Sequence, residues 1–147
     1  MKNNNNNNNN NINVVPVITY FSAFKDKFLI YKDNNKKSGI YRWNNLITNE
    51  SYIGCSISLT NRFYHYYSKK AMLNNNTNSI IYYALLEYGY SNFSLDILEY
   101  CEKDILTQRE QYYINILKPE YNILKIGKIK SKISIKKQIN RIIEEYK

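Results

Sequence analysis

Two glycine-edged triplets constrain the fold of this chain more than any other feature. Gly39-Ile40-Tyr41 and Tyr52-Ile53-Gly54 are short β-prone runs separated by ten residues. The intervening segment ends in Thr48-Asn49-Glu50-Ser51, which are residue types favoured in turns. The spacing therefore predicts a β-hairpin with an inserted or bulged loop. Because alternate strand residues share a face, each tyrosine lies on the same face as its glycine, beside bare backbone that a ligand can approach closely.

The remaining periodicity predicts a small α+β domain. The expected strands cover 39–45, 51–56 and 93–100, and the expected helices cover 59–70, 79–88 and 104–117. The second helix has an apolar i, i+3, i+4, i+7 pattern from Ile81 to Tyr88, with Ser79 as its N-cap. Asp104 is expected to cap the last helix. We therefore expect a three-stranded antiparallel sheet flanked by about three helices.

The length of 147 residues suits one folded domain with flanking segments. We expect a disordered Asn-rich leader (1–13), a loosely packed N-terminal extension (14–36), the domain proper (37–124) and a basic C-terminal tail (125–147). The leader contains nine consecutive asparagines, which bury too little apolar surface to offset chain entropy. The tail fits either a short amphipathic helix or an extended segment.

The net charge of +9 indicates a polyanionic partner, because neutralising phosphates releases bound counterions. The tail holds eight basic residues against two glutamates, a local balance of +6. A basic surface also simply aids solubility. The sequence has no apolar run long enough to span a membrane and no hydrophobic secretory segment at its start, so we expect no membrane partner.

Cysteine usage and codon bias bear on the cellular setting. Cys55 and Cys101 either pair or stay reduced, and the reduced state is favoured. Neither has a second Cys or His at the spacing of a zinc site. The richness in Asn, Ile, Lys and Tyr points to an AT-rich gene, so we expect a mitochondrial, organelle-encoded protein. The alternative is the nucleus or cytoplasm of an organism with an AT-rich genome.

Two charged residues fall on otherwise apolar helix faces. Arg62 lies within the stripe formed by Leu59, Phe63 and Tyr66, and Glu110 lies on the line of Leu106, Tyr113 and Leu117. A charge on such a face needs an opposite charge, because burying it unpaired is costly. Spacing alone favours an edge position for Arg62, from which the side chain snorkels to water, and a salt bridge for Glu110. The two residues are also candidates to pair with each other.

The two triplets, together with several residues further along the chain, resemble the signature of the GIY-YIG nuclease family. The resemblance covers about residues 36–126 and rests on features in the family's order. After the triplets come Ser56, Leu59 and Arg62 in an S-x-x-L-x-x-R pattern, then Glu110 in Arg-Glu-Gln-Tyr-Tyr-Ile, and Tyr121-Asn122 following Pro119. It implies the GIY-YIG nuclease fold and a metal-dependent endonuclease that hydrolyses phosphodiester bonds in DNA.

The resemblance assigns a role to each matching residue around the scissile phosphate. It implies that Glu110 holds a single divalent ion, Mg²⁺ or Mn²⁺. It makes Tyr41 the general base, which needs nearby positive charge because an unperturbed tyrosine has a pKa of about 10. It has Arg62 neutralise charge on the phosphate, Tyr52 orient the phosphate or water, and Asn122 fix the site.

Positions around Arg62 complete the expected site. Four residues after Arg62, where family members often carry His or Tyr, stands Tyr66, which we include as a catalytic candidate. His65 lies about 100° further round the helix and is interpreted as surface or DNA-facing. The tyrosines near Arg62 suit either a nucleic-acid surface or the core. The expected DNA-binding residues are Arg62, Lys69, Lys70, Lys128, Lys130, Lys132, Lys136 and Lys137.

The resemblance is closest to intron-encoded homing endonucleases of fungal mitochondria, and we expect a monomer that acts on DNA. Only 25 residues follow Asn122, which is little surface for recognising a long site. Two alternatives therefore stay open. One is a decayed or truncated family member that binds DNA without cutting it, and the other is a structure-specific repair nuclease. A purely structural domain is a third alternative.

Overall fold

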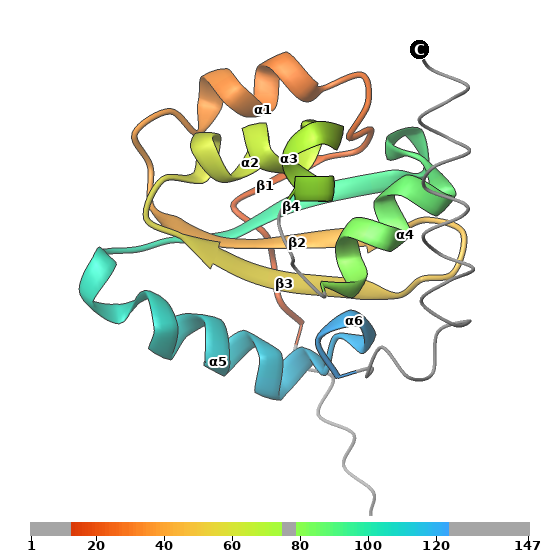
Figure 1. The fold of residues 1–147 in the computed structure, drawn as a ribbon. Coiled ribbons are helices and arrows are strands. Elements are labelled where there is room, and N and C mark those ends of the chain that lie inside the picture. The colour runs from red at the N-terminus through yellow and green to blue at the C-terminus, as the bar shows by residue number, and fades with distance from the viewer. Residues whose placement is uncertain (1–12, 75–78, 124–147) are drawn as a thin grey trace, which may run out of the picture.

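The computed structural model describes residues 13–74 and 79–123, which form a sheet covered by helices (Figure 1). The sheet is antiparallel throughout, with the order β1-β4-β2-β3. Its strands are β1 (Ile18–Tyr20), β2 (Gly39–Asn45), β3 (Ser51–Ser56) and β4 (Phe93–Tyr100). The predicted α+β class is confirmed. The sheet has four strands where three were expected, because Ile18–Tyr20 pairs with β4.

The helices follow the predicted order with different ends. They are α1 (Lys27–Asp33), α2 (Leu59–Tyr67), α3 (Lys69–Asn74), α4 (Ile80–Tyr88), α5 (Leu106–Leu117) and α6 (Glu120–Ile123), with 3₁₀ turns η1 (Tyr90–Asn92) and η2 (Lys103–Ile105). The helix expected over 59–70 breaks at Ser68, whose extended backbone ends α2 and whose hydroxyl accepts a hydrogen bond from Ala71 N. Within the described residues, no helix is long and apolar enough to cross a membrane.

The two expected N-caps turn out differently. Ser79 occupies the N-cap position of α4, although its side chain makes no capping hydrogen bond. Asp104 was expected to cap the last helix, and this prediction is wrong. It lies inside η2, and Ile105 holds the N-cap position of α5. The short 3₁₀ turn takes up the residues that helical periodicity alone assigns to the first turn of the helix.

Helices cover both faces of the sheet (Figure 1). One core lies between the sheet and α1, α2 and α4, and includes Tyr41, Trp43, Phe63, Tyr66 and Leu85. A smaller core lies between the other face and α5, and includes Ile40, Ile53, Leu98, Leu106 and Tyr113. Both faces are therefore buried, so β4 is buried at six consecutive positions, including the polar residues Ser94 and Asp96.

The N-terminal extension is part of the first core, so the expectation that it packs loosely is wrong. Ala23 and Ile30 are fully buried. The buried Asn34 amide donates to Ile30 O (2.8 Å) and to Tyr20 Oη (3.1 Å), and its Oδ1 accepts from Tyr100 Oη (2.7 Å). These bonds join the extension to the end of β4. The other flanking predictions, for the Asn-rich leader and the basic tail, fall on residues 1–12 and 124–147, outside the described residues.

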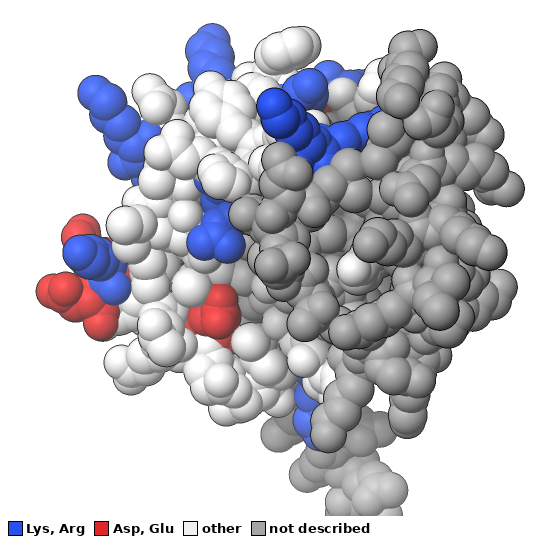
Figure 2. Space-filling model, viewed as in Figure 1, with Lys and Arg blue, Asp and Glu red and all other residues white. Residues whose placement is uncertain are grey.

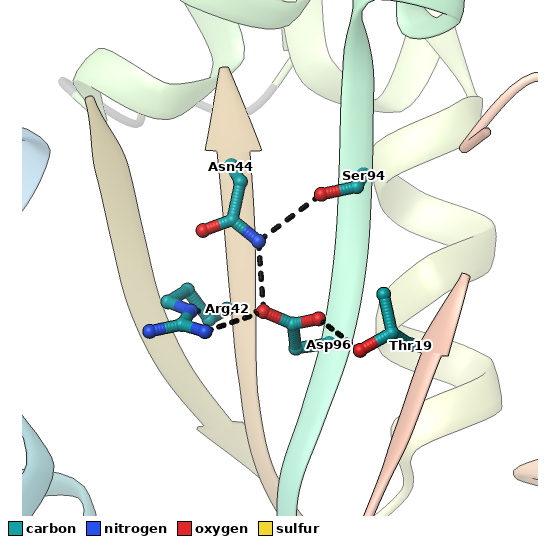
Figure 3. A network of polar contacts seen from close by, with 5 residues as sticks. All are labelled: Thr19, Arg42, Asn44, Ser94 and Asp96. Carbon is teal, nitrogen blue, oxygen red and sulfur yellow. Dashed lines mark hydrogen bonds and ion pairs between the residues drawn. The ribbon is translucent and has the colours of Figure 1, made fainter. Parts of the chain in front are cut away.

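A polar network centred on Asp96 joins three strands (Figure 3). The carboxylate is almost fully buried and accepts hydrogen bonds from Arg42 (2.7 Å), Asn44 (2.8 Å) and Thr19 (2.7 Å). Asn44 also donates to Ser94 Oγ (3.2 Å). A buried carboxylate is tolerated when it is paired and hydrogen-bonded in this way. The network therefore stabilises the pairing of β1, β2 and β4.

Both motif glycines are required by close contacts. A Cβ on Gly54 would lie 2.4 Å from Tyr41 Oη and 2.5 Å from Tyr41 Cζ, because the ring of Tyr41 lies across the neighbouring strand at that point. A Cβ on Gly39 would lie 2.3 Å from the carbonyl oxygen of Glu99, next to the irregularity between Ile40 and Tyr41. The open space that was expected beside Gly54 is thus filled by the ring of Tyr41.

We predict that Gly54→Ala lowers the free energy of unfolding by about 1–3 kcal/mol, because the new methyl group overpacks against a buried ring. In a Tyr41→Leu background the ring's outer atoms are gone, so the same substitution should cost less than about 1 kcal/mol. Urea unfolding of the four proteins in this double-mutant cycle measures both values. An equal cost in the two backgrounds would contradict the contact.

Candidate active site

Tyr41 lies in the core beneath α2 and not on an open surface. Its side chain is 1 % exposed, and its Oη is 2.9 Å from Tyr66 Oη. Its ring packs edge-on against Phe63, with centroids 5.3 Å apart. Burial raises the pKa of Tyr41 well above 10, and the neighbouring Tyr52 raises it further, whereas Tyr66 and Arg62 lower it. The phenol is therefore neutral in this structure at physiological pH.

Arg62 brings positive charge to this group of phenols. It lies on α2 and is exposed, which agrees with the edge position and not with burial of the charge. Burial lowers the pKa of its guanidinium, but the tyrosine hydroxyls around it raise that pKa above its usual value overall. Those hydroxyls belong to Tyr41, Tyr66, Tyr82 and Tyr52. The structure thus brings Arg62 together with three of the predicted tyrosines and one that was not predicted.

Glu110 approaches from the opposite face of the sheet. It is half-buried on α5, whereas Tyr52 is half-buried on the outer strand β3. Burial raises the pKa of Tyr52, and the charge of Glu110 raises it further. Burial and the neighbouring carboxylate of Glu110 raise the pKa of the Cys55 thiol, on the same strand, to about 12. Glu110 therefore lies beside two side chains of β3.

Arg62 and Glu110 do not form an ion pair with each other, so the interpretation that they neutralise one another is wrong. The ion pairs near them in the described part of the chain join Arg42 to Asp96 and Arg109 to Glu99. Arg62 and Glu110 nevertheless both affect Tyr52 and Cys55. Glu110 raises the pKa of each of these side chains, and Arg62 lowers it. The outer strand thus has a cation on one side and a carboxylate on the other, an arrangement that suits a phosphate together with a metal ion.

Asn122 binds the backbone of the outer strand. Its Oδ1 accepts from Ile53 N and its Nδ2 donates to Ile53 O, both at 2.8 Å. Ile53 lies between Tyr52 and Gly54, so the amide of Asn122 pairs with the edge of β3 as a further strand would. The carboxylate of Glu120 also accepts a hydrogen bond from Ser51 N at 3.0 Å. These contacts make Asn122 a positioning residue for Tyr52 and Gly54.

The remaining predicted residues lie around the centre formed by Tyr41, Tyr52, Arg62 and Glu110. Tyr66 is buried and joins it through Tyr41, while its carbonyl oxygen accepts a hydrogen bond from Tyr90. His65 is exposed on α2, as expected. Lys69 and Lys70 lie on α3, and Lys70 is exposed. The predicted DNA-binding residues Lys128, Lys130, Lys132, Lys136 and Lys137 lie outside the described residues.

Two residues of the centre were missed in the sequence. Tyr82 on α4 packs against Tyr66 with ring centroids 5.0 Å apart and faces Arg62. Cys55 was interpreted only as a half-buried thiol, yet it contacts Glu110. Tyr82 carries no distinguishing signal among 16 tyrosines. Cys55 follows Gly54 directly, so its place next to the motif is the one signal that points to it.

The donor set fits a hard divalent cation held by one carboxylate. Among residues 13–74 and 79–123, no group of three or more His, Cys, Asp and Glu side chains is placed to hold a metal ion. Mg²⁺ does not require such a group, because it commonly keeps several waters and binds through one or two carboxylates and substrate phosphates. Glu110, beside β3 and without Arg62 as a partner, meets that requirement.

Comparisons with known proteins found a matching family and similar solved structures. The family described as "GIY-YIG catalytic domain" matches residues 37–122, more than half of the chain. Two solved structures are also similar: the catalytic domain of homing endonuclease I-TevI, and a mutant of the catalytic domain of intron endonuclease I-TevI. Each is 28 % identical with a TM-score of 0.44 and covers 58 % of this chain. The matches span 89 % and 84 % of those chains, respectively.

We predict that Asn122→Ala lowers the free energy of unfolding by about 1–3 kcal/mol, because it leaves the backbone N–H and C=O of the buried Ile53 without their partner. Glu120→Ala, which removes one exposed bond to the same strand, should cost less than about 1 kcal/mol. Urea unfolding of both variants measures the difference. Equal stability of Asn122→Ala and the parent protein would contradict the positioning role.

Proposed function

Because the chain belongs to the GIY-YIG nuclease family, we propose that it is a divalent-metal-dependent DNA endonuclease acting at the outer edge of β3. The family match is to a catalytic domain, so the chain is an enzyme of the nuclease class. The observation that carries the proposal is the placement of Arg62 and Glu110 around Tyr52 and Cys55 without an ion pair between them. Two opposite charges left unpaired at one strand suit a phosphate that pairs with Arg62 and a metal ion that pairs with Glu110.

In this proposal Arg62 binds the scissile phosphate. Its guanidinium is exposed on α2, and its immediate neighbours are neutral hydroxyls rather than a carboxylate. A fixed cation in such a place stabilises the negative charge that develops on a phosphate under attack. The phenol of Tyr52, which lies next to both charges, orients the phosphate or the attacking water by hydrogen bonding.

Glu110 holds the metal ion in this proposal. A bound Mg²⁺ or Mn²⁺ would act as a Lewis acid on the phosphate and lower the pKa of a coordinated water. The carboxylate lies beside the side chains of Tyr52 and Cys55 on β3, where its lone pairs are available to a cation. The charge of Glu110 is otherwise uncompensated among its described neighbours, which favours cation binding.

The role of Tyr41 as general base depends on the positive charge beside it. In the structure burial keeps its pKa high, and Arg62 and the hydrogen bond from Tyr66 work in the opposite direction. The contact of 2.9 Å between the two hydroxyls lets Tyr66 donate a hydrogen bond to the oxygen of Tyr41. We therefore propose that Tyr41 releases its proton to solvent once DNA and the cation are bound, that the hydrogen bond from Tyr66 stabilises the phenolate, and that the phenolate accepts the proton of the attacking water.

The proposal also covers the type of endonuclease, its cellular location and its oligomeric state. The order of the motif residues supports a homing-type enzyme, most like those of fungal mitochondria. The bias towards Asn, Ile, Lys and Tyr supports an AT-rich gene, as in mitochondria. Residues 37–122 carry all the predicted catalytic residues, which supports action as a monomer.

We predict that the full-length protein nicks supercoiled plasmid in the presence of Mg²⁺ or Mn²⁺ and that EDTA abolishes nicking. Arg62→Ala and Glu110→Gln should each lower the rate by about 100-fold or more, because each removes a charge that acts on the transition state. Glu102→Gln changes an exposed residue shortly before α5 and should retain the parent rate.

Two outcomes would contradict parts of the proposal. If the parent protein binds plasmid without nicking it under any divalent cation, the chain is a DNA-binding relative that has lost catalysis. If Glu110→Gln nicks at the parent rate, Glu110 is not the metal ligand, whatever the activity of the enzyme.

A further inference from the structure

The outer surface of α1 and of the turn before it exposes three phenylalanines. Phe21, Phe24 and Phe28 are 79 %, 65 % and 77 % exposed. Lys25 and Lys32, also exposed, lie between and beyond them. We call these five residues the α1 surface. Phenylalanine has no polar group that benefits from water, so three such rings at one place indicate a contact surface.

Helical spacing places these side chains on one face. The turn before α1 already has helix-like bonds, from Asp26 N to Ser22 O (2.9 Å) and from Ile30 N to Asp26 O (2.8 Å). Phe21, Lys25, Phe28 and Lys32 then fall at i, i+4, i+7 and i+11. Ala23 and Ile30, on the opposite side, are fully buried against the core. The fold therefore buries the inner side of this segment and leaves the α1 surface exposed, where the Phe28 ring meets only the edge of Tyr31 (6.2 Å between centroids) and Lys27 Nζ (5.6 Å) among the described ring contacts.

The charge around this surface is positive. Residues 21–37 hold five lysines against two aspartates, a local balance of +3. Both aspartates have hydrogen-bond donors: Asp26 accepts from Ser22 N and Asp33 accepts from Tyr20 Oη. Basic side chains gather along the upper edge of the molecule in Figure 2, where α1 lies in Figure 1. A second copy of the chain would bring lysines against lysines, whereas a polyanion would neutralise them.

We infer that the α1 surface binds a single-stranded segment of DNA, with unpaired bases stacked on the phenylalanines and phosphates beside Lys25 and Lys32. Exposed aromatic rings between basic side chains match the chemistry of single-stranded nucleic acid, since every base has a face that stacks on a ring. Duplex DNA presents its phosphates but keeps the faces of its bases covered. Phenylalanine adds no hydrogen bond, so this contact tolerates any base sequence.

The α1 surface lies one helix away from the candidate active site. Tyr31 of α1 packs against Tyr64 of α2 with ring centroids 4.3 Å apart, and its carbonyl oxygen accepts a hydrogen bond from Thr60 Oγ1 (2.8 Å). The same helix α2 carries Arg62. The segment lies before the family match at 37–122, so it is an addition to the catalytic domain. The inference rests on the proposed function, in which DNA is the substrate. It adds that the preferred DNA substrate has an unpaired segment next to the cleavage site.

Fluorescence anisotropy with the full-length protein tests this inference. The probes are a labelled 20-nucleotide oligo(dT) and a labelled 20-base-pair duplex, measured with EDTA present so that nothing is cut. The test variant is Phe24→Ala with Phe28→Ala. The control is Ile105→Ala with Tyr112→Ala, which removes two exposed apolar side chains near α5, on the other side of the sheet. Circular dichroism checks that both variants keep the parent fold.

We expect the test variant to bind oligo(dT) about tenfold or more weakly, with less than about a threefold change for the duplex. The control should bind both probes as the parent does. Unchanged oligo(dT) binding, or an equal loss for both probes, would overturn the inference. Concentration-dependent dimers that the test variant abolishes, with oligo(dT) binding unchanged, would assign the surface to a second copy and overturn it too. The anisotropy experiment measures binding and not cleavage. A failure of the plasmid-nicking assay would therefore contradict the nuclease proposal without changing the outcome of this binding test.

Discussion

The rest of the structure depends on the passage of the Tyr41 ring across Gly54. The two residues are directly opposite in the β2–β3 register, and the ring leaves no space for a Cβ on the second strand. This contact turns the phenol towards the outer strand and buries it under α2. It also determines which residues lie near its hydroxyl, namely Tyr66 by hydrogen bond and Arg62 by charge. A glycine at the end of the second triplet is therefore a packing requirement.

The outer strand β3 is what keeps the two charges of the site apart. Arg62 comes from the helical layer on one face of the sheet and Glu110 from the helix on the other. They meet the same strand residues without reaching each other. Because β3 is an edge strand, it would have free backbone groups, and the amide of Asn122 occupies those of Ile53. One residue thus stabilises the edge and holds the strand that the two charges share.

Much of the sheet could be predicted because its signals are local. The strands at 39–45, 51–56 and 93–100 agree with the expected bounds, since glycine, β-prone residues and turn types mark them within a few residues. β1 was missed because it is three residues long, follows Pro16 closely, and pairs with residues near Ile97 far along the chain. The break at Ser68 was missed because no glycine or proline marks it. No local pattern reveals that Asn34 anchors the N-terminal extension.

The site was predicted as a set of residues but not as a geometry. Helical spacing identified Arg62 and Glu110 as charges on apolar faces, yet spacing alone did not decide whether they pair. The structure shows that they do not, and it shows Tyr41 buried where an open sheet face was expected. Tyr82 and Cys55 were missed because their partners come from other elements, and only the folded chain brings those elements together. The catalytic roles of all these residues stay predictions.

Mn²⁺ binding in the presence of DNA tests the central claim, that Glu110 and a bound phosphate together hold a metal ion. Electron paramagnetic resonance of free Mn²⁺ counts the ions bound by the protein with a phosphorothioate duplex that resists cleavage. The account predicts one bound ion for the parent protein and the loss of that ion in Glu110→Gln, while Arg62→Ala weakens binding of the duplex. Equal Mn²⁺ binding by the parent and Glu110→Gln would contradict it.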